Sequence, residues 1–316
     1  MSFNPKISFI LYINKNTESL EECLERLSSF DQNDVEIVIR QDQENDEANA
    51  ILDRFFNTIR PNVVFVKNQE FLGQSFCFNS AINLCSGKYI YFMAYNDVLH
   101  ENLLSEIEQP MNENYDVISL PSLKTSFFSL EKNEYNKISK ELILASGTAN
   151  LRDKIFRKEY LIESQLNFEV GKWYPDVFIL NVLLSFNKWW NILGEPLVDI
   201  RKEYSVSFNL YDYLYQVEDL FDLAIKANVY EEFKKEFDCW IITICLYQFL
   251  SKIYANYSIH FTVKKSVEKN ARIIRLAMKH VEQVISKYVP NYESNPYYKM
   301  NATKLLKYYN KSKKVM

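Results

Sequence analysis

Five short apolar runs, rich in β-branched and aromatic residues, recur at nearly even intervals near the start of this chain. They begin at residues 7, 35, 63, 89 and 115, so successive runs start 26 to 28 residues apart, about the length of one strand–helix unit. The runs are Ile7–Ile13, Val35–Arg40, Val63–Lys67, Tyr89–Ala94 and Tyr115–Leu120. Apolar side chains occupy both alternating positions, which predicts parallel strands buried on both faces.

Helical patterns separate the first four runs. Their apolar residues repeat at the i, i+3, i+4, i+7 positions of an amphipathic helix. The three sets are Leu20, Cys23, Leu24 and Leu27; Ala48, Ile51, Leu52 and Phe55; and Phe78, Ala81, Ile82 and Cys85. This alternation of strand and helix predicts an α/β fold with a doubly wound, mostly parallel sheet.

The remainder of the chain favours helices. One helix is expected from about Asp176 to Phe186, after a mixed region that contains the polar and aromatic tract Ser122–Asn136. From about residue 209 the pattern is helical throughout, in the segments Leu210–Lys226, Tyr230–Tyr257 and Val263–Tyr288.

Composition and charge exclude several classes of protein. Of the 316 residues, 47% are hydrophobic and 25% are charged, which is ordinary for a globular chain with a real core. The net charge of −4 disfavours general nucleic-acid binding. The five cysteines form no CxxC pair, so we interpret them as reduced, buried thiols. No signal peptide opens the chain and no apolar stretch reaches the ~20 residues that span a bilayer, so we expect a cytoplasmic protein.

Glycine is scarce, with five in the whole chain. In open α/β sheets the ligand binds beyond the carboxyl ends of the strands. The turn after the first run, Asn14-Lys15-Asn16-Thr17-Glu18, has no glycine, and no GxxxxGK[ST] motif occurs. A Rossmann dehydrogenase and a P-loop protein are therefore disfavoured, and a bound nucleotide would have to be held by side chains or a metal.

An ordered set of short motifs follows the strands. In chain order they are Gln41-Asp42 and Asp46; Asn68, Gly73, Ser75 and Asn79; Ser86-Gly87-Lys88-Tyr89-Ile90; Ala94-Tyr95-Asn96-Asp97; Lys154-Ile155-Phe156-Arg157; Trp173-Tyr174-Pro175-Asp176; and Gly194-Glu195-Pro196-Leu197 with Arg201. Each motif is weak alone, but the order is specific. Over about residues 6 to 208 it resembles the family 2 inverting glycosyltransferases of the GT-A fold.

The resemblance implies a site for a nucleotide sugar. Asp42 matches the family's aspartate that hydrogen-bonds the nucleotide base, typically uracil, whose ring N–H a carboxylate can accept. Asp97 is the remaining carboxylate of an acidic motif that binds Mn²⁺ or Mg²⁺ in the family. Asp176 matches the family's general base. Further nucleotide contacts are expected from Tyr12, Asn14, Asn79 and Asn96.

The chain also departs from the family's pattern. Gln41 stands where the family usually has the first of two aspartates, and Phe78 stands where an arginine is usual. Ala94 and Asn96 occupy carboxylate positions of the acidic motif. These departures favour a second hypothesis, a glycosyltransferase-like protein that has lost catalysis and acts as a binding or stabilising subunit. Cations that could replace the missing charge are Arg152, Lys154, Arg157 and Arg201, and the alternative for each is a solvated surface charge. A third, weaker hypothesis is a nucleotidyltransferase. That class usually needs a glycine-rich basic loop after the first strand, and this sequence lacks such a loop.

Every candidate site residue also has a purely structural interpretation. Asp42 and Asp46 suit loop or helix-cap acids, and Asn79 suits a helix surface. Asp97 suits a cap before a helix that begins at Val98-Leu99, and Asp176 suits the cap of the helix that follows it.

The leading hypothesis is an enzyme that moves a sugar from a UDP-sugar, with inversion, to a glycan, glycolipid or glycoprotein acceptor in bacterial surface polysaccharide synthesis. We expect a glycosyltransferase domain over residues 1–208, with a nucleotide-binding half 1–125 and an acceptor-side half 126–208. A helical region follows over residues 209–316. Its basic tail, from Lys299 onward, suits either solvent or the inner face of an anionic membrane near a lipid-linked acceptor. Homo-oligomerisation stays open.

Overall fold

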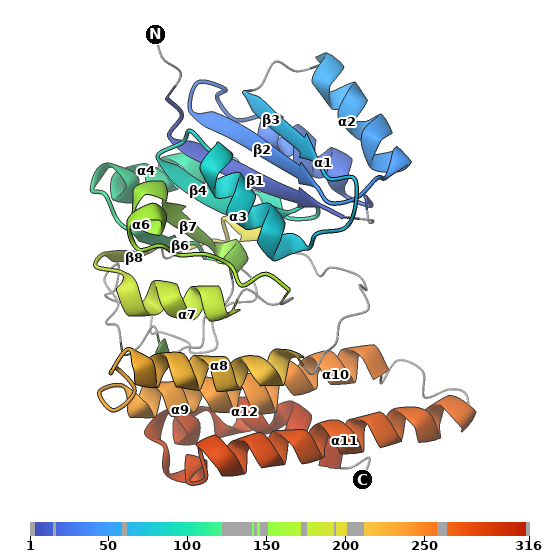
Figure 1. Cartoon of the computed structure of the whole chain (residues 1–316), viewed down its shortest axis with the longest axis vertical. Coiled ribbons are helices and arrows are strands. Elements are labelled where there is room, and N and C mark those ends of the chain that lie inside the picture. Colours follow the sequence, from blue (N-terminus) through green and yellow to red (C-terminus); the bar gives the residue numbers. More distant parts are fainter. Residues whose placement is uncertain are drawn as a thin grey trace. The chain divides into compact units, whose positions relative to one another are not determined.

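The computed structural model packs into two compact units, residues 1–138 with 149–206 and residues 139–148 with 207–316. The residues it describes are 4–14, 17–58, 62–121, 141, 144–145, 151–171, 176–192, 194–200, 212–257 and 264–313. The first unit contains the sheet and the second is helical (Figure 1). The described residues 141, 144 and 145, which the sequence assigned to the first domain, group with the helical unit.

The first unit is built on a seven-stranded sheet in the order β3-β2-β1-β4-β7-β6-β8. Its strands are β1 (Ile7–Ile13), β2 (Val35–Gln41), β3 (Val63–Lys67), β4 (Tyr89–Ala94), β6 (Val117–Ser119), β7 (Lys154–Arg157) and β8 (Trp189–Asn191). Every neighbouring pair is parallel except the two that include β7, which is antiparallel to β4 and β6. The predicted doubly wound, mostly parallel sheet is therefore confirmed.

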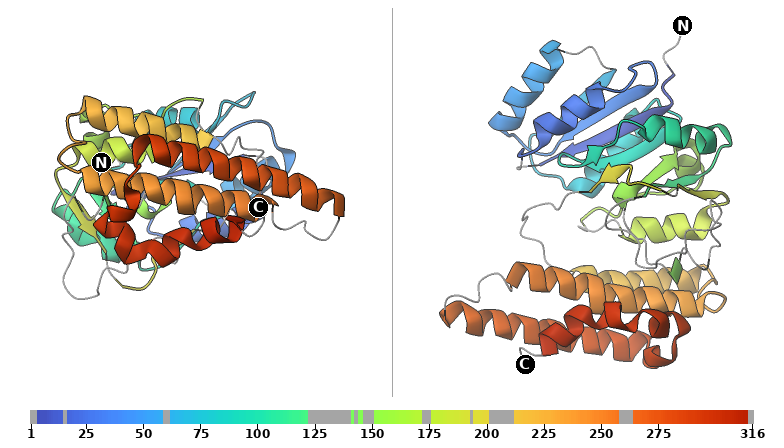
Figure 2. Two further views of the ribbon diagram at one scale, coloured as in Figure 1. Left: turned by 90° about the horizontal axis from the view of Figure 1, so that it is seen from below. Right: turned by 180° about the vertical axis from the view of Figure 1, so that it is seen from behind.

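Helices cover both faces of this sheet. The helices α1 (Leu20–Ser28), α2 (Asp46–Thr58) and α4 (Leu103–Asn112) share one buried cluster with alternate residues of β1, β2 and β4. The helices α3 (Gln74–Leu84), α6 (Lys158–Glu163) and α7 (Asp176–Ser185) contribute to the other face. Figure 1 shows α3 and α6 in front of the sheet, and the right view of Figure 2 shows α1 and α4 on the opposite side.

An aromatic cluster fills the space between β4 and the second layer of helices. Phe78 of α3, 1% exposed, has its ring centroid 4.9 Å from that of Phe92 and 5.2 Å from that of Phe168. Phe168 stacks on Phe178 of α7, with 3.9 Å between ring centroids and 9° between planes. Phe156 of β7 joins them, 5.9 Å from Phe92. The phenylalanine that replaces the family's arginine is therefore a core residue that supports α7.

Gly87 explains the motif that precedes β4. A Cβ atom on Gly87 would lie 2.6 Å from both the amide N and the Oγ of Ser8. The bare backbone instead lets the Gly87 N–H donate to Ser8 Oγ at 2.9 Å, while that hydroxyl donates to Glu36 Oε2 at 2.5 Å. Glu36 also accepts hydrogen bonds from Ser86, so this motif joins β1, β2 and β4 at their amino ends.

Short elements escaped the sequence patterns. The fifth predicted run, Tyr115–Leu120, is a strand only over Val117–Ser119. After β4, Val98–Leu99 form the strand β5, which pairs with β9 (Val198–Asp199), and the helix α4 begins only at Leu103. Strands of two to four residues are too short to display a period of their own.

The second unit consists of helices packed side by side (Figure 2). They are α8 (Asp212–Lys226), α9 (Lys234–Ile242), a π-helical stretch (Thr243–Phe249), α10 (Leu250–Tyr257), α11 (Lys264–Tyr288) and α12 (Pro296–Lys313). The π-helical stretch joins α9 to α10. The basic tail forms α12, which buries Leu305 and Ser312. None of the helices in the described part is both long and apolar enough to cross a membrane.

All five cysteines are buried, as the sequence predicted, and none lies in a disulfide bond. Burial raises the pKa of Cys77 to about 11, and the nearby Asp42 charge adds to this effect. Burial also raises the pKa of Cys85 and of Cys239 to about 12. These thiols stay protonated near neutral pH, so they are poor nucleophiles and poor metal ligands.

The aromatic cluster makes a prediction about stability. Phe78→Ala removes a fully buried ring and should lower the free energy of unfolding by about 3–5 kcal/mol. Phe76, on the same helix, is 39% exposed, so Phe76→Ala should cost less than about 1 kcal/mol. Urea denaturation followed by circular dichroism measures both variants. Equal losses for the two would contradict the role given to the cluster.

Candidate functional site

Polar residues gather at one edge of the sheet. The parallel strands β1, β2 and β4 end there, followed by Asn14, Asp42 and the turn 95–97. Strand β7 runs the opposite way, with Ile155 opposite Tyr91, so the residues that precede β7 come to the same edge. Carboxyl ends of parallel strands are where α/β sheets bind their ligands. We therefore take this edge as the candidate site.

Asp42 is a heavily hydrogen-bonded carboxylate at this edge, and its residue is 1% exposed. Its Oδ2 accepts hydrogen bonds from the Tyr12 hydroxyl at 2.9 Å and the Gly73 amide at 2.9 Å. Its Oδ1 accepts hydrogen bonds from Asn68 Nδ2 at 3.0 Å and the Leu72 amide at 2.8 Å. The carboxylate thus holds the segment between β3 and α3 against the ends of β1 and β2.

These bonds bear on both interpretations of Asp42. An ionised carboxylate has about four acceptor positions, and four protein donors occupy them here. A base N–H would reach Asp42 only if one of those donors gave way, so the base contact stays a prediction. The helix-cap alternative is wrong, because Asn45 caps α2 by accepting the Ala48 amide at 3.1 Å.

Arg40, which the sequence analysis missed, belongs to the same network. It lies in β2, is 3% exposed, and donates from Nη2 to Asn68 Oδ1 at 3.0 Å. Asn68 therefore bridges Arg40 and Asp42, two buried groups of opposite charge. A cation inside a strand predicted to be buried was the available signal, because buried charges in proteins are paired or hydrogen-bonded.

Asn79 uses both ends of its amide within the protein. Its Nδ2 donates to the Phe168 carbonyl at 2.8 Å, and its Oδ1 accepts the Phe168 amide at 2.8 Å. It therefore ties α3 to the segment after α6 and holds Phe168 in the aromatic cluster. The structure thus gives Asn79 a role within the fold that the sequence did not suggest. A nucleotide contact from Asn79 stays a prediction.

Asp97 closes the turn after β4. Its Oδ2 accepts the Ala94 amide at 2.9 Å, while its own amide donates to the Ala94 carbonyl at 3.1 Å. Val98 and Leu99 form β5, so the alternative that Asp97 caps a helix is wrong. Asn96 lies in the same turn and is 6% exposed.

A cation from the second half of the sheet lies beside this turn. Arg152 Nη1 is 3.4 Å from Asp97 Oδ1, and the Arg152 side chain is 17% exposed against 0% for Asp97. The Tyr91 hydroxyl donates to the Arg152 carbonyl, which holds the backbone of Arg152 at the end of β4. Burial, followed by the Asp97 charge, raises the pKa of Tyr91 well above its ordinary value.

Two other candidate cations, Lys154 and Arg157, form ion pairs with other carboxylates. Lys154 is fully buried, with its Nζ 2.5 Å from Asp153 Oδ1. Arg157 pairs with Asp116 at 2.7 Å, near the amino end of β4, and its side chain is 17% exposed. The surface-charge alternative is therefore wrong for Lys154. Arg201 lies outside the described residues.

The turn after β4 does not fit a divalent metal. Mn²⁺ and Mg²⁺ prefer several hard oxygen ligands, with carboxylates foremost. Asp97 supplies one carboxylate, and it faces both a main-chain amide and the Arg152 guanidinium. In the part of the chain that the structure describes, no three His, Cys, Asp or Glu side chains come together to hold a metal ion.

The predicted base, Asp176, is the first residue of α7, and its side chain lies outside the described part of the structure. The preceding Trp173-Tyr174-Pro175 lies outside it as well. Its catalytic role therefore stays a prediction.

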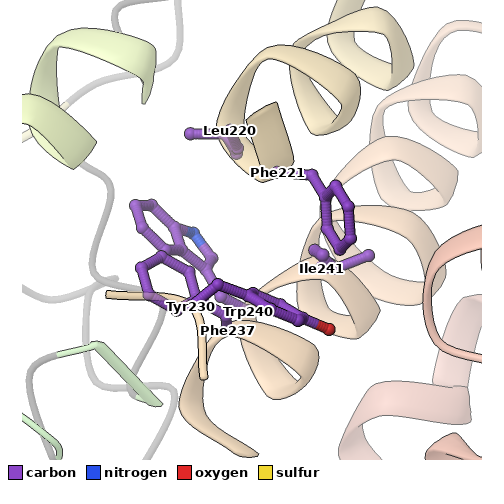
Figure 3. Close-up of a pocket in the computed structure, with 6 residues that line it drawn as sticks. All are labelled: Leu220, Phe221, Tyr230, Phe237, Trp240 and Ile241. Atoms are coloured by element: carbon purple, nitrogen blue, oxygen red, sulfur yellow. The ribbon is translucent and has the colours of Figure 1, made fainter. Parts of the chain in front are cut away.

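A hollow in the helical unit is a packing gap rather than a nucleotide site. Figure 3 shows it between α8 and α9, where its lining residues are Leu220, Phe221, Tyr230, Phe237, Trp240 and Ile241. It leaves no room even for a water molecule, whereas small-molecule sites typically enclose ~300–1,000 Å³, and its lining is apolar.

Comparison with known proteins identifies a matching family and two related proteins. The family model described as "Glycosyl transferase family 2" matches residues 9–172. The poly(ribitol-phosphate) beta-glucosyltransferase of Bacillus spizizenii is 24% identical over 250 residues, which cover 73% of this chain and 38% of that protein. The minor teichoic acid biosynthesis protein GgaB of Bacillus subtilis is 26% identical over 216 residues, covering 63% and 23%. The chain thus matches well under half the length of either relative.

Solved structures share the fold. Residues 1–349 of S. aureus TarS, in complex with UDP-GlcNAc, superpose with a TM-score of 0.62 at 15% identity, covering 97% of this chain and 92% of that one. A mannosyltransferase from Pyrobaculum calidifontis, in complex with GDP-Man and Mn²⁺, gives 0.57 at 12% identity, covering 98% and 88%. The first unit therefore has the GT-A fold, and a helical region follows it.

The hydrogen bonds of Asp42 make a prediction about the segment that it holds. Asp42→Asn removes acceptor capacity, and each donor left unsatisfied should cost about 1–3 kcal/mol. The Leu72 and Gly73 amides should then exchange faster with deuterium, as mass spectrometry can measure. Glu44→Gln is the matched control, because Glu44 pairs with Lys67 on the surface with its side chain 55% exposed. Unchanged exchange in Asp42→Asn would show that Asp42 does not hold this segment.

Proposed function

The chain belongs to glycosyl transferase family 2, and on that premise we propose that it transfers a sugar from a UDP-sugar to a hydroxyl group of a bacterial surface glycopolymer. The observation that carries the proposal is the family match over residues 9–172. That range contains the ends of β1, β2 and β4 and the start of β7, which are the elements that form the polar edge.

The nucleotide is proposed to bind along this edge. Asn14 and Asp42, at the ends of β1 and β2, would face the base and ribose, and Asn96 and Asp97 after β4 would face the diphosphate. Tyr12 and the segment 68–73 shape the base side, because Asp42 holds both. With no phosphate-cradling glycine loop in the sequence, recognition falls to side chains and to the amides of this segment.

The proposed reaction is a single displacement at the anomeric carbon. The acceptor oxygen attacks as the bond from that carbon to the diphosphate oxygen breaks, so one C–O bond forms and one is lost with inversion. The acceptor proton passes to a base, and the nucleoside diphosphate leaves with the bonding electron pair. The base must lie within hydrogen-bond reach of the acceptor hydroxyl. Asp176, at the first turn of α7, is the proposed base.

The proposed acceptor is a polymer of the kind named for the curated relatives, one of which is a poly(ribitol-phosphate) transferase. Charge complementarity supports an anionic polymer, because α12 has no acidic residue and carries five exposed lysines. These are Lys299, Lys304, Lys307, Lys311 and Lys313. The same lysines would support contact with an anionic membrane and a location at its inner face, which remain part of the proposal.

A second candidate function has its own support. Phe78 is a core residue where the family usually has an arginine, and Asp97 is the one carboxylate of the turn after β4. Both observations favour a protein that binds a nucleotide sugar without turning it over. Binding without transfer would identify this second function.

The proposal predicts separate effects on binding and turnover for one substitution. Asp176→Asn should leave UDP affinity within about twofold, while transfer from the UDP-sugar should fall by about 10²–10⁴-fold because the base is lost. Calorimetry with UDP and release of UDP from a panel of UDP-sugars measure the two effects. Glu163→Gln, an exposed residue of α6, is the control and should change neither.

The outcomes separate the alternatives. Absence of UDP binding by the unmodified protein, with and without Mn²⁺, would sink the proposed function. Binding without release of UDP would favour the impaired protein. Unchanged turnover in Asp176→Asn would remove Asp176 as the base.

A further inference from the structure

The charge of a leaving diphosphate must be offset by a cation at the end of β4. In GT-A enzymes that keep a full acidic motif, a metal held by that motif can supply this charge. Here the turn retains Asp97 alone as a carboxylate, and its donor set does not fit a divalent ion. A different positive group is therefore needed if the proposed reaction occurs.

Arg152 lies where such a group is needed. It belongs to the short helical turn Leu151–Asp153, which comes directly before β7. Because β7 is antiparallel to β4, with Ile155 opposite Tyr91, this turn lies level with the end of β4. The hydrogen bond from Tyr91 to the Arg152 carbonyl fixes the backbone there.

Asp97 forms an ion pair with the guanidinium. One carboxylate oxygen is held by the Ala94 amide at 2.9 Å, and the other lies 3.4 Å from Arg152 Nη1. The carboxylate is fully buried, whereas the arginine side chain is 17% exposed, so part of the arginine reaches solvent at the polar edge. The ion pair with the buried carboxylate keeps the positive charge of the partly exposed arginine at this edge. A planar guanidinium can bind two phosphate oxygens at once.

Neighbouring cations do not compete for this role. Lys154 is buried against Asp153, and Arg157 pairs with Asp116 near the amino end of β4. Arg40 is 3% exposed and bonds to Asn68. Of the cations whose side chains the structure describes in 152–157, Arg152 alone combines partial exposure with a place at the polar edge.

We propose that Arg152, oriented by Asp97, binds the diphosphate of the nucleotide sugar and offsets the charge of the leaving group without a divalent metal. This inference rests on the proposed function. The guanidinium supplies positive charge and N–H donors, while the acceptor proton goes to the base. Asp97 is then a positioning residue for Arg152 rather than a metal ligand.

The test is calorimetric binding of UDP in EDTA and in Mn²⁺. Unmodified protein should bind UDP with affinities that agree within about threefold in the two conditions. Arg152→Gln should weaken UDP by roughly 10–100-fold, which is the effect of losing charge-assisted hydrogen bonds. The loss for UMP should be smaller, because UMP lacks the second phosphate. Arg152→Lys should recover part of the affinity.

Matched variants keep the test specific. Arg26→Gln removes a surface arginine that pairs with Glu101 at 2.9 Å and should leave UDP affinity unchanged. Asp97→Asn should weaken UDP in EDTA, and Mn²⁺ should not restore the loss. The metal comparison on unmodified protein needs no variant, so it decides the question even if Arg152→Gln does not fold.

The possible results distinguish the role of Arg152 from the proposed function. A tenfold or greater requirement for Mn²⁺, or an unchanged UDP affinity in Arg152→Gln, overturns the role of Arg152 while leaving nucleotide binding intact. Failure of unmodified protein to bind UDP under any condition overturns the proposed function itself, and this inference with it.

Discussion

Strand direction is the constraint on which the rest of the first unit depends. Strands that run parallel end at the same edge of a sheet, so residues that are far apart in the chain come side by side. In this way β1, β2 and β4 bring Asn14, Asp42 and Asp97 together. The reversed strand β7 starts at that edge and places Arg152 against Asp97. The candidate site is therefore a product of topology, and it needs no glycine-rich loop.

The longer elements could be predicted because they are long enough to show a period. β1, β3 and β4 have their predicted bounds, and the helix that begins at Asp176 ends one residue earlier than expected. The short strands β7 and β8 could not be predicted in this way, because cross-strand pairing defines them rather than any pattern of their own. The antiparallel direction of β7 could not be predicted from the sequence either, because the direction of a strand depends on the strands with which it pairs.

The positions of the site residues could be predicted better than their partners. Motif order pointed to Asp42, but its four donors come from β1 and from the segment 68–73, and no spacing rule assigns a donor to an acceptor. The phenylalanine at position 78 looked like a lost cation, and only the packing of Phe92 and Phe168 against it shows why an aromatic ring suits the position. Arg152 was one of four candidate cations, and its place beside Asp97 at the polar edge distinguishes it from Lys154 and Arg157.

The central claim is that an arginine held by Asp97, rather than a metal, meets the diphosphate at the polar edge. A crystal grown with UDP and Mn²⁺, with diffraction measured at the manganese absorption edge, tests this claim most directly. We predict diphosphate oxygens within hydrogen-bond distance of the Arg152 guanidinium and no anomalous peak beside Asp97. A manganese peak that bridges Asp97 and the diphosphate would contradict it.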